Sequence, residues 1–298
     1  MTRSNLAGIA GAAALFAAVS AASAQSPVVP SQGADRAGKG SLALGSGAQN
    51  QQPVKKETTK VTVTEKETSW EISGPVYLRS ADPEPPGEII IKNIFGWETA
   101  DDAEDEYEYE LEVEYGLVEN HELILEMPWQ IGDGRIDGNG DLTLGWHWRL
   151  WNEDGMLPAF ALRNYVRLPS GVDSAGVDYI LRGLATWTVI DNSMRFHLNP
   201  YLKSLNGNNY GDEARHFLWG TALGIDYKLT DDLLFITDYI YGAGKEEHTR
   251  DDHRAEFGLD WNIDEHQKLG LALEVGLDGD SHGADLGARV SYMLSFGG

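Results

Sequence analysis

The clearest pattern in the chain is a strict alternation of apolar and acidic side chains over residues 107–115. Glutamates separate the apolar positions Tyr107, Tyr109, Leu111, Val113 and Tyr115. An extended strand places all the apolar groups on one face, whereas a helix would spread the glutamates around its circumference. The pattern therefore predicts a β-strand. Aromatic residues at both ends are typical of a strand that crosses a bilayer, although one solvent-facing strand of a soluble antiparallel sheet fits the segment equally well.

The rest of the chain decides between these readings, because similar alternation recurs at nearly even spacing. The predicted strands occupy residues 88–97, 107–115, 123–129, 142–150, 160–168, 179–189, 194–203, 217–227, 233–241, 257–263, 269–277 and 286–296. With flanking residues added to these alternating segments, the predicted strands are roughly 10 to 13 residues long, enough to cross a bilayer when tilted. Short turns follow the even-numbered strands and longer polar loops follow the odd-numbered ones, as in outer-membrane barrels. We predict an all-β fold, a transmembrane antiparallel up-and-down β-barrel of about 12 strands over residues 88–298.

The part of the chain before the barrel is expected to serve targeting and attachment. Arg3 precedes an apolar run and a small-residue cleavage site before Gln25, which is the order found in a secretory signal peptide, so residues 1–24 are expected to be removed. Residues 25–87 are rich in small and polar residues and are broken by prolines. Such a composition buries too little apolar surface to fold, so we expect a flexible, disordered periplasmic tether.

Composition narrows the classes of function. The 298 residues include 23 Lys and Arg against 47 Asp and Glu, a formal charge of -24, which argues against a nucleic-acid partner. There is no cysteine, which excludes a disulfide framework and thiolate chemistry. No segment after the signal peptide approaches 18 consecutive apolar residues, so a helical membrane protein is excluded. A secreted soluble protein or a barrel in the cell outer membrane remains.

Three segments carry motifs in which a strand end joins a turn. They are Tyr115-Gly116-Leu117 with Asn120-His121-Glu122-Leu123 and Met127-Pro128, then Gly138-Asn139-Gly140-Asp141-Leu142-Thr143-Leu144-Gly145, then Leu157-Pro158-Ala159-Phe160-Ala161 with Leu168-Pro169-Ser170-Gly171. In order and spacing over residues 88–298, they resemble the MetA-pathway-of-phenol-degradation family of outer-membrane β-barrel proteins. The resemblance implies a transporter-like barrel for small solutes, hydrophobic or aromatic compounds among them. It supplies no functional residues.

The alternating register assigns charged residues to the barrel interior. The expected acidic lumen-lining residues are Glu106, Glu108, Glu110, Glu112, Glu114, Glu122 and Glu126. The expected basic lumen-lining residues, on the strands that follow, are Arg149, Arg163, Arg167, Arg182, Arg195 and Lys203. Two interpretations stay open. The two charged walls either face each other across an aqueous pore and orient polar or dipolar solutes, or form ion pairs that close a narrow lumen.

The predicted function is an outer-membrane channel or transporter for small solutes through a charged lumen. The alternatives are a closed structural or adhesion barrel without conductance and, with less support, a lipid-modifying enzyme, which would need a Ser–His pair on the lipid-facing rim. We expect no catalytic residues, no cofactor and no metal. The expected partners are outer-membrane lipids, an unidentified small solute and the outer-membrane insertion machinery. The last of these is expected because the final strand ends on the alternating residues Tyr292, Leu294 and Phe296, with Gly297 and Gly298 after them.

Overall fold

The protein is represented by a computed structural model of the whole chain. It describes residues 72, 74–99, 105–131, 138–172, 174–206, 215–244, 249–277 and 285–297. Every regular element among these residues is a β-strand. None of them belongs to a helix long and apolar enough to cross a membrane. The predicted signal peptide and the tether as far as residue 71 lie outside the described residues.

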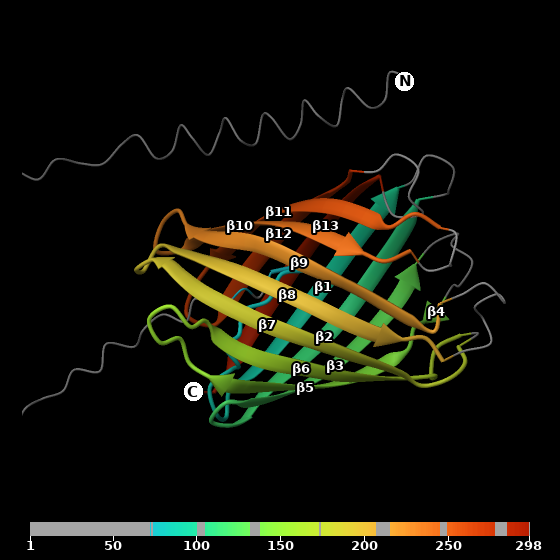
Figure 1. The fold of residues 1–298 in the computed structure, drawn as a ribbon, viewed down its shortest axis with the longest axis horizontal. Helices are drawn as coiled ribbons and strands as arrows, with labels where there is room; N and C mark the ends of the chain where they lie inside the picture. Colours follow the sequence, from blue (N-terminus) through green and yellow to red (C-terminus); the bar gives the residue numbers. More distant parts are fainter. Residues whose placement is uncertain are drawn as a thin grey trace, which may run out of the picture. The chain divides into compact units, whose positions relative to one another are not determined.

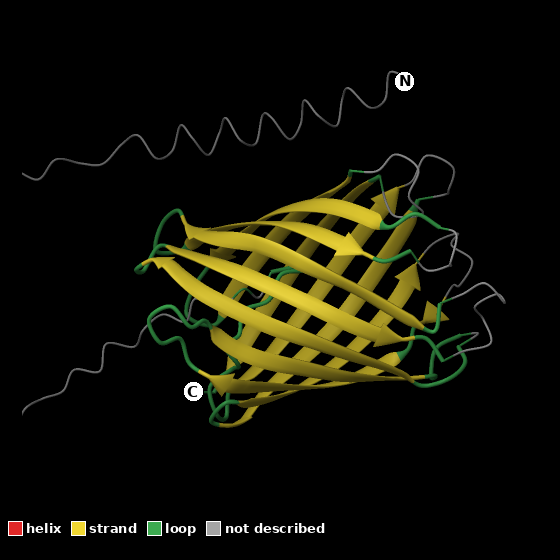
Figure 2. Ribbon diagram, viewed as in Figure 1, coloured by secondary structure: helices red, strands yellow, loops and turns green. Residues whose placement is uncertain are grey.

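Twelve long strands and one two-residue strand form a single antiparallel sheet (Figures 1 and 2). In chain order they are β1 (Ile89–Thr99), β2 (Glu106–Val118), β3 (His121–Ile131), β4 (Gly138–Asn139), β5 (Leu142–Trp151), β6 (Ala159–Leu168), β7 (Asp178–Ile190), β8 (Met194–Ser204), β9 (Phe217–Lys228), β10 (Leu233–Gly242), β11 (Asp252–Asn262), β12 (Gln267–Gly276) and β13 (Leu286–Phe296). Each long strand pairs with the long strands next to it in the chain, and β1 also pairs with β13. The sheet therefore closes into a barrel, which confirms the predicted fold class.

Connections of two lengths distinguish the two ends of the barrel. At one end the connections are short turns, except for the longer one between β5 and β6, and in two of the turns Asn120 and Asn192 adopt positive φ angles of 66° and 54°. Asparagine tolerates this left-handed conformation better than most residues, which suits it to tight turns. Longer loops join the strands at the other end. In outer-membrane barrels the short turns face the periplasm, so β1 begins and β13 ends at the periplasmic end.

The outward face of the barrel is apolar and carries aromatic residues near both ends. Leu144 leaves 47 % of its surface exposed. Trp146 stacks on Trp148 with 5.8 Å between ring centroids, and Tyr109 stacks on Trp129 at 5.4 Å. An apolar belt with aromatic girdles is the surface that lipid requires, while polar groups face the lumen. The protein is thus a transmembrane β-barrel of the cell outer membrane.

One strand begins earlier than its sequence pattern predicted. β11 starts at Asp252, whereas the alternation of apolar residues indicated a start at Phe257. The sequence predicts a charged loop that ends at Asp252 and assigns residues 253–256 to no strand. In the barrel, Glu256 is fully buried and Arg254 pairs with Glu274 at 2.7 Å. Charged side chains are accommodated on the inward face, so a charged run does not end a barrel strand.

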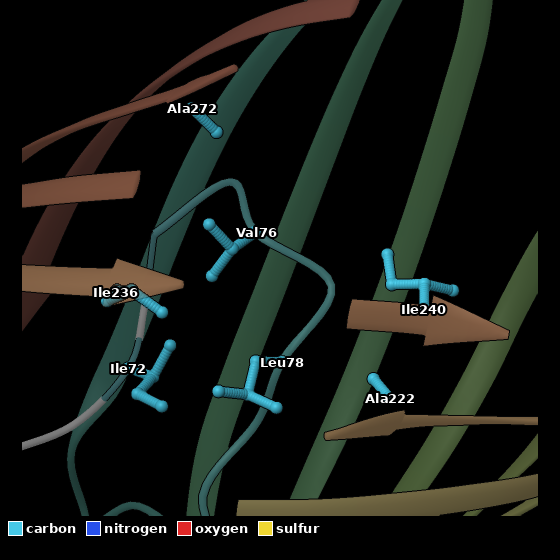
Figure 3. Packing of buried hydrophobic residues seen from close by; sticks show 7 residues of the cluster. All are labelled: Ile72, Val76, Leu78, Ala222, Ile236, Ile240 and Ala272. Carbon is cyan, nitrogen blue, oxygen red and sulfur yellow. The ribbon is translucent and has the colours of Figure 1, made fainter. Parts of the chain in front are cut away.

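Residues 74–87, the lumenal segment, lie inside the barrel just before β1. Ile72 and the segment's Val76 and Leu78 are at most 1 % exposed. They pack against the inward-facing side chains of Ala222, Ile236, Ile240 and Ala272 (Figure 3). This contact keeps apolar lumen side chains out of water, which stabilises the inserted segment. The prediction of a flexible tether through residue 87 is therefore wrong for the lumenal segment.

Two glycines let the lumenal segment approach the barrel wall closely. A Cβ atom at Gly74 would overlap the carboxylate of Asp260, and one at Gly116 in β2 would overlap the carbonyl oxygen of Pro85. Gly87 N–H donates to the Gly116 carbonyl at 2.7 Å on the same stretch. A larger side chain at Gly116 would displace backbone atoms, so this position requires glycine, whereas one at Gly74 would displace only the Asp260 carboxylate.

Candidate solute site in the barrel lumen

A buried cluster of ion pairs joins β1, β2, β3 and β6. Arg163 Nη2 lies 3.3 Å from Glu114 Oε1 and 3.2 Å from Glu122 Oε1. Lys92 Nζ lies 3.0 Å from Glu112 Oε1 and 2.5 Å from Glu114 Oε2. All five side chains are at most 3 % exposed. Because an unpaired buried charge is costly, the contacts of these two cations with the three carboxylates stabilise this part of the lumen against loss of either partner.

A second network holds the lumenal segment at Ala81. Ala81 N–H donates to Thr186 Oγ1 at 2.9 Å, and that hydroxyl lies 3.0 Å from His197 Nδ1. The hydroxyl and Nδ1 are within hydrogen-bond distance, and the tautomer of His197 decides which of them donates. Nε2 lies 3.4 Å from Asp226, and Asp226 also pairs with Arg195 at 2.5 Å. The backbone at residue 81 is thereby tied to β7, β8 and β9.

The lumenal segment is also attached to other strands around the barrel. Further contacts include Tyr77 N to Glu256 Oε2 (2.6 Å), Arg79 N to Asn199 Oδ1 (2.7 Å), Glu84 N to Glu122 Oε2 (3.0 Å), and Asp82 to Arg149 (3.0 Å) and Arg195 (3.5 Å). Their wall partners belong to β3, β5, β8 and β11. These connections reach opposite sides of the ring, so the segment spans the lumen.

The path of the segment places it in the periplasmic half of the barrel. Gly74 lies beside Asp260 and Pro85 lies beside Gly116, and both contacts are near the short-turn end. Arg79, between them, bonds to the middle of β8. The segment therefore rises from the periplasmic end to about mid-barrel and returns to the start of β1.

A third charged cluster, on β1 and β11 to β13, was missed by the sequence reasoning. Arg289 Nη1 lies 2.7 Å from Glu256 Oε1, and Arg289 Nη2 lies 3.0 Å from both Glu98 Oε1 and Glu274 Oε2. Arg254 Nη1 lies 2.7 Å from Glu274 Oε1. The same alternation that revealed the other strands puts these residues at inward positions. The predicted lumen-lining residues include none after Lys203, although the alternation of apolar and polar residues on the later strands indicates these inward positions as well.

Above the lumenal segment, toward the long-loop end, lies a cavity of about 240 Å³. Tyr77 and Arg79 of the segment form part of its floor. The wall contributes Glu110 from β2, Glu126 from β3 and Arg182 from β7. The lumenal segment therefore closes the cavity from below.

The charges around this cavity are not paired with one another. Arg182 lies 4.2 Å over the ring of Tyr77 and donates to the Tyr77 carbonyl at 3.4 Å. Arg79 donates to carbonyl oxygens of its own segment. Within the part of the chain that the structure describes, neither arginine forms an ion pair, and Glu110 and Glu126 form neither an ion pair nor a hydrogen bond.

The predicted acidic and basic residues do not form two continuous facing walls, although Glu108, Glu110, Glu112, Glu126 and Arg182 share the lining of the cavity. Among the acids, Glu112, Glu114 and Glu122 are buried, Glu110 and Glu126 are half-buried, and Glu106 and Glu108 are exposed. Among the bases, Arg163 and Arg195 are buried, and Arg149, Arg167, Arg182 and Lys203 are half-buried. Arg163 pairs with Glu114 and Glu122, whereas Arg149, Arg167 and Arg195 pair with aspartates outside the predicted set. Over the described ranges, no group of three or more His, Asp or Glu side chains is arranged to hold a metal ion.

Comparisons with known proteins agree with this architecture. A family model described as "Putative MetA-pathway of phenol degradation" matches residues 60–294. The crystal structure of an outer membrane channel from Pseudomonas putida F1 is similar at 15 % identity with a TM-score of 0.57, over 72 % of this chain and 98 % of that chain. The NanC porin is similar at 12 % identity with a TM-score of 0.53, over 68 % of this chain and 98 % of that chain. At these identities the likeness shows a shared fold. A search of curated proteins found no match.

Proposed function

Because the chain belongs to the MetA-pathway-of-phenol-degradation family, we propose that this barrel is an outer-membrane channel for small solutes. The observation that carries the proposal is the cavity of about 240 Å³ within a lumen lined by charged side chains. A concave, charged lining suits polar groups of a solute and disfavours lipid tails. The channel and porin named among the similar structures support the same function.

The lumenal segment obstructs the periplasmic half of the lumen in the conformation described. Its buried side chains and its bonds to β3, β5, β7, β8 and β11 leave it in contact with the wall on several sides. Passage of a solute therefore requires the segment to move. This requirement separates the channel from the alternative of a closed structural barrel, in which the segment would stay in place permanently.

A disulfide crosslink tests this proposal, and the chain has no natural cysteine to interfere. A Cβ atom at Gly74 would lie 2.7 Å from Asp260 Cγ, which puts the two Cβ atoms within disulfide reach. The double variant Gly74→Cys with Asp260→Cys is recorded in planar bilayers before and after reduction. We expect current steps to appear or grow on reduction, and each single-cysteine variant to be insensitive to the reductant. Silence of the folded wild type and of both redox forms would favour the closed barrel.

The proposal includes no enzymatic activity. A lipid-modifying enzyme needs a nucleophile and a histidine on the lipid-facing rim. His147 and His197 are fully buried in the lumen, where they contact Ala81 and Thr186. On the outward face, His121 stacks on Trp146, and the His253 ring is hydrogen-bonded to the Tyr239 hydroxyl. The proposed partners are outer-membrane lipids on the outward face and the insertion machinery during assembly.

A preference for hydrophobic or aromatic solutes remains a prediction from the family. The cavity offers the rings of Tyr77 and Tyr165 to such a solute. The charged side chains beside these rings favour a solute that is polar at its ends. Conductance blocking by phenol and by a nonaromatic alcohol of similar size would compare the two kinds of solute directly.

A further inference from the structure

The cavity above the lumenal segment holds opposite charges that do not neutralise each other. Glu110 and Glu126 lie on the neighbouring strands β2 and β3, whereas Arg182 lies on β7, three strands beyond β3 in the ring. Arg79 contributes a second guanidinium from the floor. Glu108 also lines the cavity on the β2 side. Glu112 and Arg289 belong to the lining too, but Glu112 is paired with Lys92, and Arg289 is paired with Glu98, Glu256 and Glu274. The unpaired charges of the lining therefore form a negative side and a positive side, with the cavity between them.

The positive side is held in place by contacts that leave its charge unpaired. The guanidinium of Arg182 lies over the Tyr77 ring and donates to the Tyr77 carbonyl, both of which are neutral. Arg79 is likewise bonded to neutral carbonyl oxygens. A cation–π contact and a carbonyl orient a guanidinium without cancelling its charge. The arginines are thus kept from moving across the cavity to the glutamates.

A charge with reduced access to water gains most from a partner of opposite sign. A cationic solute would pair with Glu110 and Glu126 and leave Arg79 and Arg182 unsatisfied. An anionic solute would pair with Arg79 and Arg182 and leave Glu110 and Glu126 unsatisfied. A molecule that carries one group of each sign can pair with both sides at once. Its binding free energy is therefore more favourable than that of a solute with only one of the two charges.

We propose that the cavity binds a small zwitterion, with its cationic group at Glu110 and Glu126 and its anionic group at Arg79 and Arg182. The volume of about 240 Å³ is below the ~300–1,000 Å³ of pockets for drug-sized ligands, which restricts the solute to small molecules. The inference rests on the proposed channel function only for the route by which the solute passes. Binding itself needs no conduction.

Calorimetric titration of the purified full-length protein in detergent tests the proposal. The probes are glycine, 4-aminobutanoate and 6-aminohexanoate, with butylammonium and butanoate as one-charge controls for the second. We expect at least one of the zwitterions to bind about tenfold or more tightly than either control. Binding should weaken between 0.1 M and 1 M salt, because the Debye length falls from about 10 Å to about 3 Å. No binding of any zwitterion, or equal binding of butylammonium or butanoate, overturns the proposal.

Variants separate the two ends of the site. Arg182→Gln should remove the advantage of the zwitterion over butylammonium, and Glu110→Gln with Glu126→Gln should remove its advantage over butanoate. Glu265→Gln, in a periplasmic turn with its side chain 78 % exposed, is the matched control and should change neither ratio. Heat-dependent migration in SDS gels verifies that each variant is a folded barrel.

Conductance recorded on the same samples separates this inference from the channel proposal. A protein that prefers the zwitterion but never conducts is a binding barrel, so the channel proposal fails and the site stands. A protein that conducts but shows no preference among the probes is a channel without this site, so the zwitterion proposal fails alone.

Discussion

Replacing Arg163 by glutamine removes a cation that lies between two fully buried carboxylates. Arg163 Nη2 is 3.3 Å from Glu114 and 3.2 Å from Glu122. After the change, Glu114 keeps Lys92 at 2.5 Å and Glu122 keeps the Glu84 N–H at 3.0 Å. Breaking a buried ion pair costs about 3–5 kcal/mol. Because each carboxylate retains one partner, we expect the loss of unfolding free energy to be at the lower end of this range, about 3 kcal/mol. This loss corresponds to roughly a hundredfold increase in the unfolding equilibrium constant.

Arg149→Gln is the matched control, because it removes the same group from a partly exposed ion pair. Arg149 lies 3.0 Å from Asp82, with side chains that are 23 % and 43 % exposed. Exposed pairs contribute about 0–1 kcal/mol. Urea unfolding in lipid vesicles, followed by tryptophan fluorescence, measures both variants. With a slope of about 1–3 kcal/mol per M, the midpoint should fall by about 1–3 M for Arg163→Gln and by less than about 1 M for Arg149→Gln.

Equal midpoints for the two variants would refute the argument that burial sets the cost of losing an arginine here. Arg163→Lys should lie between the wild type and Arg163→Gln, because an ammonium keeps the charge but cannot reproduce the planar guanidinium fork. A lysine variant less stable than the glutamine variant would show that packing around Arg163, rather than its charge, controls stability.

Other substitutions test the lipid face and the lumenal segment. Leu144→Arg places a charge against lipid and should cost about 2–4 kcal/mol in urea unfolding in vesicles, so a harmless change would mean that its face was assigned wrongly. Leu78→Ala removes a fully buried side chain and should cost about 2–5 kcal/mol, with faster trypsin cleavage after Arg79. Gly116→Ala should also accelerate that cleavage by pushing the segment off β2. Gly155→Ala, at a φ of 60° with open space around it, should cost about 1–2 kcal/mol without changing the cleavage.

The sequence predicted the strands well because a barrel imposes a period of two on its lipid-facing and lumen-facing positions. Leu144 and His147 illustrate the two sides of β5, one exposed to lipid and the other fully buried. The same rule indicates which charges point inward but not which of them meet. The partners of Arg163 depend on the tilt and closure of the sheet, which place β6 near β2 and β3 in space.

The lumenal segment could not be predicted from local patterns, because it forms no regular element and its composition resembles that of a linker. Its stabilising contacts join residues far apart in the chain, such as Val76 and Leu78 with Ile236 and Ile240. The sequence feature that indicates an inserted segment lies in the barrel strands, not in the segment itself. Ile236 and Ile240 occupy inward positions of β10, where contact with water in the lumen would be unfavourable. Another part of the chain is therefore expected to cover them.

The lumenal segment also links closure of the lumen to solute recognition. Tyr77 orients Arg182, and Arg79 forms part of the cavity floor, so moving the segment dismantles the positive side of the proposed site. A solute that binds only while the segment is inserted must stabilise the inserted state, and at a hundredfold excess over its dissociation constant this amounts to about 2.7 kcal/mol. By the same linkage, opening must weaken binding by an equal free energy. Movement of the segment would therefore release the solute at the moment when the path to the periplasm opens.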